Sequence, residues 1–171
     1  IVGPNADVKL RSEHADYEVE LVVVIGRGGR DIDAADAWDH VLGLTAGQDI
    51  SDRALQFAAK PPHFDLGKSR DTYGPLGPTL VSPGMFADPN DLALTCAING
   101  EERQNSRTSN MIFSVADQIA YLSSIMTLAP GDIIFTGTPD GVGGPNGIFL
   151  QPGDVITSEV EGIGTLTNRC I

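Results

Sequence analysis

Two glutamates in the stretch DYEVELVVVIG have the spacing of paired metal ligands. Glu18 and Glu20 stand two residues apart in a segment that is otherwise rich in Val and Leu. Side chains two apart in a β-strand project from the same face. Two unit charges about 5 Å apart repel by roughly 3 kcal/mol at an effective dielectric of about 20, and a divalent cation would turn that repulsion into attraction. Mg²⁺, Mn²⁺ and Ca²⁺ all prefer carboxylate oxygens.

A metal held by this pair needs a third carboxylate at the end of another strand. Asp49, in GQDISDR, follows the strand-like stretch LGLTAGQ and is such a residue. The alternative is an edge strand whose polar face, with Asp16, Glu18 and Glu20, lies in water. The alternation of side chains permits both interpretations.

Short apolar runs, separated by 20 Gly and 11 Pro, predict many short strands and turns in one domain. We expect strands at 17–25, ending near Asp49, around an Asn99-Gly100 hairpin, in GDIIFTG before a glycine-rich loop, and twice in the last twenty residues. We expect helices at 34–41 with Asp33 as N-cap, within SDRALQFAAK, and at 114–128. The stretch PPHFDLGKSRDTYGPLGP is expected to be a loop. The predicted class is α+β with β dominant.

The bulk properties exclude several kinds of partner. A net charge of −12 and a pI near 4.4 disfavour a nucleic-acid phosphate backbone. The longest apolar runs, such as LVVVIG, are too short to cross a bilayer. Cys96 and Cys170 form no zinc or disulfide pattern, so we expect a reducing, cytoplasmic location. Because the chain starts at Ile1 and not at a methionine, we expect that an upstream segment is absent from it.

Neither glycine-rich stretch predicts a nucleotide site. VIGRGGRDI lacks the G-x-G-x-x-G spacing and a following βαβ unit, and GTPDGVGGPNG lacks the GK[ST] of a phosphate loop. We interpret both stretches as turns.

Six motifs occur in an order that resembles the C-terminal catalytic domain of the fumarylacetoacetate hydrolase family. They are DYEVELVVVIG, QDISDRALQ, LGKSRDTYGPLGP, INGEERQNSRTSNMIFS, LAPGDIIFTGTPDGVG and LQPGDVITSEVEGIGTLTN. Each motif alone is weak, but together they cover residues 16–168. The resemblance implies a mixed β-sandwich roll and a homodimer, with residues 1–171 as a single catalytic domain.

The resemblance also implies a metal and a substrate class. In that family an E-x-E pair and a downstream Asp bind Mg²⁺ or Mn²⁺, and they match Glu18, Glu20 and Asp49, although Ca²⁺ also suits such ligands. The family acts on small 2-oxo or enol carboxylates, whose two oxygens can chelate the metal. The metal then acts as a Lewis acid on the developing enolate.

Five further residues match family positions around the metal. Lys68 and Gln56 are implied as catalytic and substrate-contacting residues, and Thr138 is implied to meet the substrate carboxylate through its hydroxyl or amide. Arg53 either binds substrate or forms a structural ion pair. Thr72 is implied to support the metal's water shell. Lys68 as a plain surface lysine and Thr138 as a turn residue before a proline are the alternatives.

The acid–base pair of the hydrolytic members has no counterpart in this chain. Those members use a His–Glu pair upstream of the E-x-E strand to activate water. His14 is the only histidine before Glu18 and is expected in an exposed loop, as is His63. His40 is expected to be packed or solvated.

The leading expectation is therefore a divalent-metal-dependent hydrolase that cleaves a C–C bond in a 2,4-diketo, acylpyruvate-like acid from aromatic catabolism. The pair that activates water would lie in the absent segment. One alternative is an isomerase or decarboxylase for 2-hydroxyhepta-2,4-diene-1,7-dioate or oxaloacetate, which needs no water activation. A non-catalytic metal-binding relative is the other.

Overall fold

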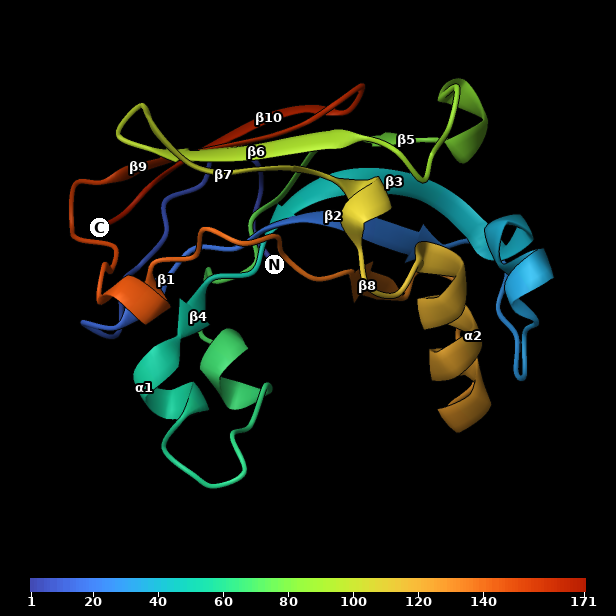
Figure 1. Ribbon diagram of the computed structural model, residues 1–171, viewed down its shortest axis with the longest axis horizontal. Helices are drawn as coiled ribbons and strands as arrows, with labels where there is room; N and C mark the ends of the chain where they lie inside the picture. Colours follow the sequence, from blue (N-terminus) through green and yellow to red (C-terminus); the bar gives the residue numbers. More distant parts are fainter.

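The computed structural model describes residues 1–171 and consists mainly of two stacked four-stranded sheets (Figure 1). The first sheet has the order β5-β3-β2-β8 and the second β10-β9-β6-β7, while β1 and β4 form a small separate ladder. The strands are β1 (Ala15–Asp16), β2 (Val19–Ile25), β3 (Val41–Gln48), β4 (Ser51–Asp52), β5 (Leu76–Val81), β6 (Ala93–Ile98), β7 (Glu101–Arg107), β8 (Ile133–Phe135), β9 (Val155–Val160) and β10 (Gly164–Arg169). This confirms the expected β-dominated fold.

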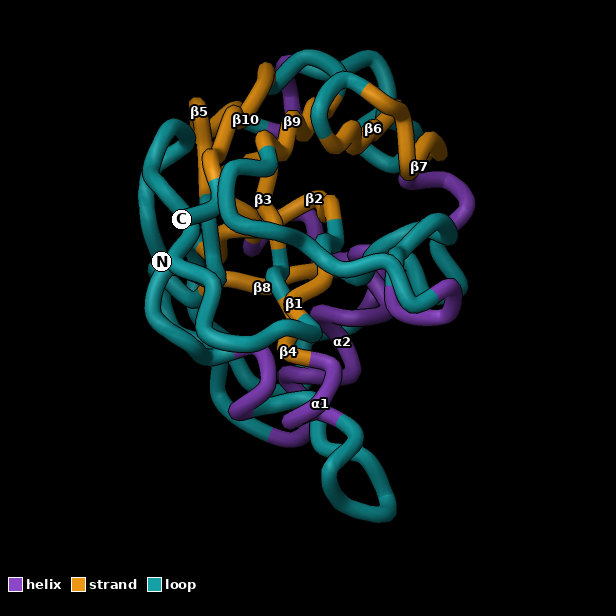
Figure 2. The backbone as a smooth tube through the Cα atoms, turned by 90° about the vertical axis from the view of Figure 1, so that its left-hand side faces the viewer, coloured by secondary structure: helices purple, strands orange, loops and turns teal.

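The helices are short and lie outside the two sheets. Two are α-helices, α1 (Arg53–Gln56) and α2 (Val115–Ile125), and five are 3₁₀ helices: η1 (Ala34–His40), η2 (Leu66–Lys68), η3 (Pro83–Met85), η4 (Thr108–Asn110) and η5 (Gly144–Asn146). The α1 region and α2 both project from the side of the first sheet that faces away from the second (Figures 1 and 2). No helix has the length and apolar character needed to cross a membrane.

The core lies between the sheets. Val19, Leu21, Val23 and Ile25 form one face of β2 and join a cluster of 26 buried residues. In this cluster β2 and β3 pack against β6 and β9. Period-two alternation places the next residues, including Glu20, on the opposite face of β2, so the strand positions a carboxylate while its apolar face is held by the core.

Several expected elements are confirmed. The β6–β7 hairpin turns at Asn99 and Gly100, whose φ angles of 53° and 82° suit a tight hairpin turn. Helix α2 begins at a capping box in which Ser114 and Asp117 each accept from the other's backbone amide. Asp33 precedes η1 without the side-chain cap bond that was expected.

The strand expected at about 17–25 is confirmed with a start two residues later, at Val19. The edge-strand alternative is wrong, because β2 lies between β3 and β8. Glu18 and Glu20 are 7% and 2% exposed, so they do not form a solvated face. The strand β5, in a region where no strand was expected, is the edge of this sheet.

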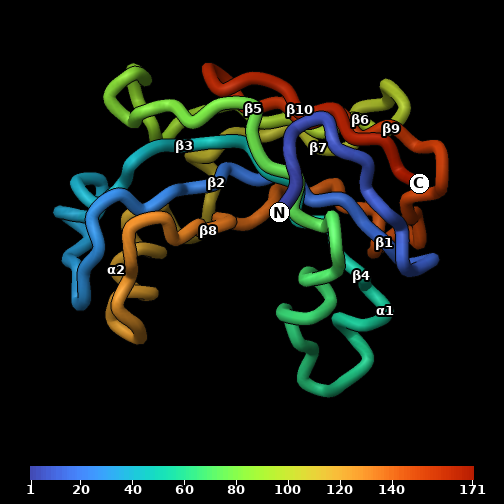
Figure 3. Tube along the Cα trace, turned by 180° about the vertical axis from the view of Figure 1, so that it is seen from behind, coloured from blue at the N-terminus to red at the C-terminus, as the bar shows by residue number.

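The two ends of the chain are joined (Figure 3). Val8 forms a parallel bridge with Cys170, and the amides of Leu10 and Ile171 donate to the carbonyls of Ile171 and Val8 at 2.9 Å. The amide of Thr167 donates to the carbonyl of Pro4 at 2.9 Å. Residues 4–10 therefore run beside residues 167–171, while Val2 pairs with Pro75.

Candidate metal and substrate site

Three carboxylates meet at the end of the first sheet where β2 starts and β3 stops. Val19 is the register partner of Gln48, so Glu18 and Asp49 are neighbours, and the amide of Asp49 donates to the carbonyl of Glu18 at 2.9 Å. Oxygen atoms of Glu18, Glu20 and Asp49 all lie within 4.8 Å of one another. The structure thus brings together the three predicted metal ligands.

Two cations contact this triad from the α1–η2 region. The ammonium of Lys68 lies 2.7 Å from Glu18 Oε2, 2.7 Å from Asp49 Oδ2 and 2.9 Å from the Ser51 hydroxyl. Nη2 of Arg53 lies 2.7 Å from Glu18 Oε1. Lys68 is therefore not a plain surface lysine, and both oxygens of Glu18 have a cationic partner.

Glu20 is the least neutralised member of the triad. Its one hydrogen-bond donor is the amide of Gly137, 2.7 Å from Oε2. Burial, and after it the Asp49 carboxylate, raises the pKa of Glu20 from 4.5 to about 8. Burial also raises the pKa of Asp49, against the lowering effect of Lys68. Burial lowers the pKa of Lys68 itself, but the nearby carboxylates outweigh it and leave that pKa raised.

The donor set fits a hard divalent cation. Three carboxylates supply oxygen ligands only, and their excess negative charge, together with their burial, is the condition in which a cation is most stabilising. Glu20 and Asp49 each accept one protein hydrogen bond through their carboxylates, and only the donor to Glu20 is uncharged.

Two buried glutamines hold the backbone at the metal-ligand end of β2. Gln48 Oε1 accepts from the amide of Glu18 at 2.9 Å, and Gln104 Oε1 accepts from the amide of Val19 at 3.0 Å. Gln104 Nε2 in turn donates to Thr138 Oγ1 at 2.9 Å. Both side chains are at most 1% exposed. The sequence analysis missed both glutamines, although a polar residue at an inward strand position was a usable signal.

Thr138 uses its hydroxyl for structure. The hydroxyl donates to the carbonyl of Val19 at 2.9 Å and accepts from Gln104, so of the two groups proposed to meet a substrate carboxylate only the amide lacks a protein partner. Thr136 makes the same type of bond to the carbonyl of Leu21 at 2.9 Å. Beyond the end of the β2–β8 ladder, these two threonine hydroxyls bond to the backbone carbonyls of β2.

A cavity of about 520 Å³ opens beside Glu18. Its polar lining includes Arg53, Gln56 and Thr138. The Gln56 side chain is fully buried, with Oε1 accepting from Arg53 Nη1 at 2.9 Å and Nε2 without a partner. Three of the residues predicted to contact substrate, Arg53, Gln56 and Thr138, thus line one cavity beside the predicted metal ligand Glu18.

Thr72 and the histidines lie apart from this cavity. Thr72 has a φ of 73° and its hydroxyl accepts from the amide of Lys9 at 2.8 Å, so its role in a metal's water shell stays a prediction. His14 is exposed and packs edge-on against Phe149, as a loop residue should. His63 is exposed and lies 3.7 Å from Asp65. The ring of His40 contacts Arg27, far from the triad.

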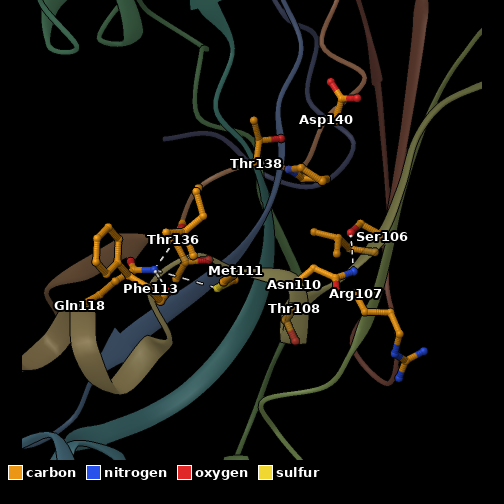
Figure 4. A pocket seen from close by; sticks show the side chains of 14 residues that line it. Ser106, Arg107, Thr108, Asn110, Met111, Phe113, Gln118, Thr136, Thr138 and Asp140 are labelled. Carbon is orange, nitrogen blue, oxygen red and sulfur yellow. Dashed lines mark hydrogen bonds between the residues drawn. The ribbon is translucent and has the colours of Figure 1, made fainter.

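A second cavity, of about 480 Å³, lies on the other side of the 136–140 segment (Figure 4). Figure 4 shows Thr138 and Asp140 at one end of it and Gln118 and Phe113 at the other. Gln118 Nε2 donates to the carbonyls of Phe113 and Thr136 at 3.0 Å, so it fixes the wall and has no free donor directed at a ligand.

Comparison with known proteins places this site in a family. The family model for the fumarylacetoacetate (FAA) hydrolase C-terminal domain matches residues 1–171. The human mitochondrial oxaloacetate tautomerase FAHD2A is 43% identical over 175 residues, which cover all of this chain and 56% of that protein. The chain thus spans little more than half the length of this relative.

Two solved structures are also similar. A 2-hydroxyhepta-2,4-diene-1,7-dioate isomerase from Mycobacterium marinum is 40% identical with a TM-score of 0.89, covering 99% of this chain and 64% of that one. A fumarylpyruvate hydrolase from Pseudomonas aeruginosa, in complex with Mn²⁺ and pyruvate, is 34% identical with a TM-score of 0.90, covering 99% and 74%. The Mn²⁺ in the latter supports a divalent metal for this family.

Proposed function

The chain belongs to the fumarylacetoacetate hydrolase family, and on that premise we propose that it carries the active site of a divalent-metal-dependent isomerase for a small 2-oxo dicarboxylic acid. The observation that carries the proposal is the buried triad of Glu18, Glu20 and Asp49, with Lys68 and Arg53 against it. A metal and fixed cations together would bind an anionic 2-oxo acid. This site supplies three carboxylate ligands for a metal, and Lys68 and Arg53 are the fixed cations.

The triad would hold Mg²⁺ or Mn²⁺, which supplies a Lewis acid for the oxygens of the 2-oxo acid. The three donors of the Lys68 ammonium are taken by Glu18, Asp49 and Ser51. Lys68 would therefore act through its positive charge on the negative charge that develops on the substrate's 2-oxo oxygen. Arg53 and the free Nε2 of Gln56 would bind a carboxylate of the substrate, and the amide of Thr138 would donate to it.

We choose isomerisation for two reasons: the reaction consumes no water, and two similar proteins carry names of this reaction class. In keto–enol exchange the C3–H bond breaks and an O–H bond forms at the 2-oxo oxygen, so no water is consumed. The relative that covers the whole chain at 43% identity is named an oxaloacetate tautomerase, and an isomerase structure is 40% identical. These names support the reaction class and leave the natural dicarboxylate open between oxaloacetate and the heptadienedioate.

The test compares the full wild-type chain with Glu20→Gln in Mn²⁺ titrations and in tautomerisation of oxaloacetate, followed by the ultraviolet absorbance of the enol. We expect wild type with Mn²⁺ to exceed the rate in buffer with Mn²⁺ alone, and Glu20→Gln or a chelator to abolish the excess. Equal Mn²⁺ affinity in both proteins would refute the metal site. Metal binding without acceleration of oxaloacetate or heptadienedioate conversion would make the chain a non-catalytic relative.

C–C hydrolysis of an acylpyruvate is the second candidate, because the hydrolase neighbour holds pyruvate and Mn²⁺. Loss of the diketone absorbance of an acylpyruvate, with pyruvate as a product, would favour it over isomerisation. Stable diketone absorbance beside rapid enol conversion would exclude it.

We further propose a homodimer. Ile112, Phe113 and Tyr121, in and before α2, are 92%, 68% and 67% exposed, which is unusual for apolar side chains so close in sequence. Light scattering of the protein as it elutes from a size-exclusion column gives the molar mass of the assembly directly. The mass of a monomer at micromolar concentration would reject this proposal.

A further inference from the structure

Asp16 is a buried carboxylate that takes no part in the metal triad. Its side chain is fully buried and accepts four hydrogen bonds, three from amides and one from Arg53 Nε, and it forms an ion pair with Arg53 Nη2. The amide donors are Tyr17 at 2.9 Å, Gly143 at 2.8 Å and Gly144 at 2.9 Å. A buried charge with this many donors is held in one position, so the groups that donate to it are held as well.

Arg53 is fixed by these contacts. Its Nε and Nη2 each lie 2.8 Å from Asp16 Oδ2, while Nη2 also contacts Glu18 Oε1 at 2.7 Å and Nη1 donates to Gln56 Oε1 at 2.9 Å. All three guanidinium nitrogens therefore have partners. Asp16 binds the edge of the fork that faces away from Gln56, so it sets the plane in which the guanidinium meets the cavity.

The Asp16 carboxylate also holds the loop at Gly143 and Gly144, whose amides donate to it. A Cβ on Gly144 would lie 3.1 Å from Asp16 Oδ2 and 3.3 Å from Arg53 Nε, and a Cβ on Gly143 would lie only 2.0 Å from the carbonyl oxygen of Ile148. Glycine is needed at both positions for this close approach and not for an unusual φ, since neither has a positive φ. Gly144 also lines the cavity beside Arg53.

We propose that Asp16 is a positioning residue that fixes Arg53 and the Gly143–Gly144 wall as one unit. The unit sets the distance between the cation that binds the substrate carboxylate and the backbone that faces it. This inference deepens the proposed function and rests on it for the identity of the anion.

A purely electrostatic role for Asp16 makes the opposite prediction. If its negative charge only weakened the field of Arg53, removal of the charge would strengthen binding of an anion. If it positions Arg53, removal of the charge frees the guanidinium and weakens binding. The sign of the change in affinity therefore separates the two roles.

The experiment compares the full wild-type chain with Asp16→Asn and Gly144→Ala. Asp16→Asn removes the charge, whereas Gly144→Ala keeps it and crowds the contact between Asp16 and Arg53. Gly84→Ala is the matched control, because a Cβ there meets nothing within 4 Å and the φ is ordinary. Two readouts are taken: the Nε–H signal of Arg53 by ¹⁵N NMR with Mg²⁺, and the affinity of the Mn²⁺-loaded protein for pyruvate by calorimetry.

We expect a slowly exchanging Nε–H of Arg53 in wild type and in Gly84→Ala, and faster exchange in both site variants. We expect pyruvate affinity to fall about 10-fold in Asp16→Asn and about 3-fold in Gly144→Ala, with Mn²⁺ affinity changed less. In steady-state assays of the proposed reaction, KM should rise with little change in kcat. In an Arg53→Lys background, Asp16→Asn should have little further effect on pyruvate affinity.

Unchanged exchange of the Arg53 Nε–H in Asp16→Asn, or tighter pyruvate binding, would overturn the proposal. A lower unfolding temperature with pyruvate affinity and KM unchanged would also overturn it, since Asp16 would then be only structural. If wild type binds no pyruvate in the presence of Mn²⁺, the proposed function fails. The NMR comparison then still decides whether Asp16 positions Arg53.

Discussion

The cavity beside Glu18 has two unlike walls. The fastened wall, residues 137–145, has no regular strand but is bonded to its surroundings: Gly137 to Glu20, Thr138 to Gln104, Gly141 to Tyr17, and Gly143 and Gly144 to Asp16. The exposed wall, residues 57–66, presents Phe57 and Phe64 with 55% and 67% of their surface exposed. These two rings contact each other edge-on, with centroids 6.4 Å apart.

The difference between the walls indicates which of them holds the site residues at fixed positions. The fastened wall donates to Glu20 and, through Gly143 and Gly144, to the carboxylate of Asp16 that holds Arg53. Glu20 and Arg53 are the groups that we propose to meet a metal and a carboxylate at fixed distances. Lys68, two residues after the exposed wall, contacts the triad, but Phe57 and Phe64 are more than half exposed. We infer that the fastened wall sets the chemistry that family members share, and that the exposed wall adapts to the rest of the substrate.

The largest effect is expected where both walls meet, at the triad. Asp49→Asn keeps the size of the side chain but removes one ligand charge and one partner of Lys68. Mn²⁺ affinity should fall at least about 100-fold, because a charge a few Å from a divalent ion in a buried site interacts strongly. Calorimetric titration measures it. A loss of less than about 3-fold would mean that the metal lies elsewhere.

At a residue of β7 that holds the fastened wall, Gln104→Leu should cost about 3 kcal/mol of stability. The variant leaves the amide of Val19 buried without an acceptor and frees Thr138, and each lost buried bond contributes about 1–3 kcal/mol. Urea unfolding measures the change. Gln151→Leu, at an exposed position, is the control and should change stability by less than about 0.5 kcal/mol. Equal effects of the two substitutions would break the comparison.

Glu20 makes the metal-free fastened wall sensitive to pH. Its pKa in the folded state, about 8, is above the unfolded value near 4.5, chiefly because of burial. The folded state therefore binds the proton more tightly, so this stabilisation is complete below pH 4.5 and is lost as pH rises through about 8. Between pH 5 and pH 9 the free energy of unfolding of the metal-free wild type should fall by on the order of 3 kcal/mol more than that of Glu20→Gln.

Urea unfolding in EDTA across this pH range tests the Glu20 prediction. Mn²⁺ should remove the difference in wild type, because the cation replaces the proton. Parallel pH curves for wild type and Glu20→Gln in EDTA would show that Glu20 ionises normally in the folded state.

The smallest effect is expected on the exposed wall. Phe64→Ser should change the free energy of unfolding by less than about 0.5 kcal/mol and alter mainly KM. Tyr17→Phe, which removes only the 3.1 Å bond from the hydroxyl to the Gly141 carbonyl, should cost about 1 kcal/mol. If Phe64→Ser destabilises the protein more than Tyr17→Phe does, the distinction between the walls is wrong.

The sequence predicted the parts of the site that lie on or next to regular elements. Glu18, Glu20 and Asp49 were found because period-two spacing and a strand end are local signals, and the order of motifs added Lys68 and Arg53. The edge-strand alternative for β2 could not be rejected from the sequence, because strand order depends on pairing with β8 more than 100 residues away.

The contacts that hold the site were harder to predict. The side chains of Gln48 and Gln104 accept from the backbone amides of Glu18 and Val19. Asp16 accepts from Arg53 and from the amide of Gly143, which lies 127 residues downstream. Long-range side-chain bonds of this kind leave no periodic pattern in the sequence.

The pairing of residues 4–10 with residues 167–171 has a consequence for how the chain folds. Pro4 and Val8 find their partners at Thr167 and Ile171, about 160 residues later. Contacts between residues so far apart in the sequence slow folding, because a long loop must be ordered before they form. Elsewhere in the segment before Glu18, Val2 and Ala15 have partners nearer in the sequence, at Gly74 and Asp52. We therefore expect the seam at Pro4 and Val8 to close last.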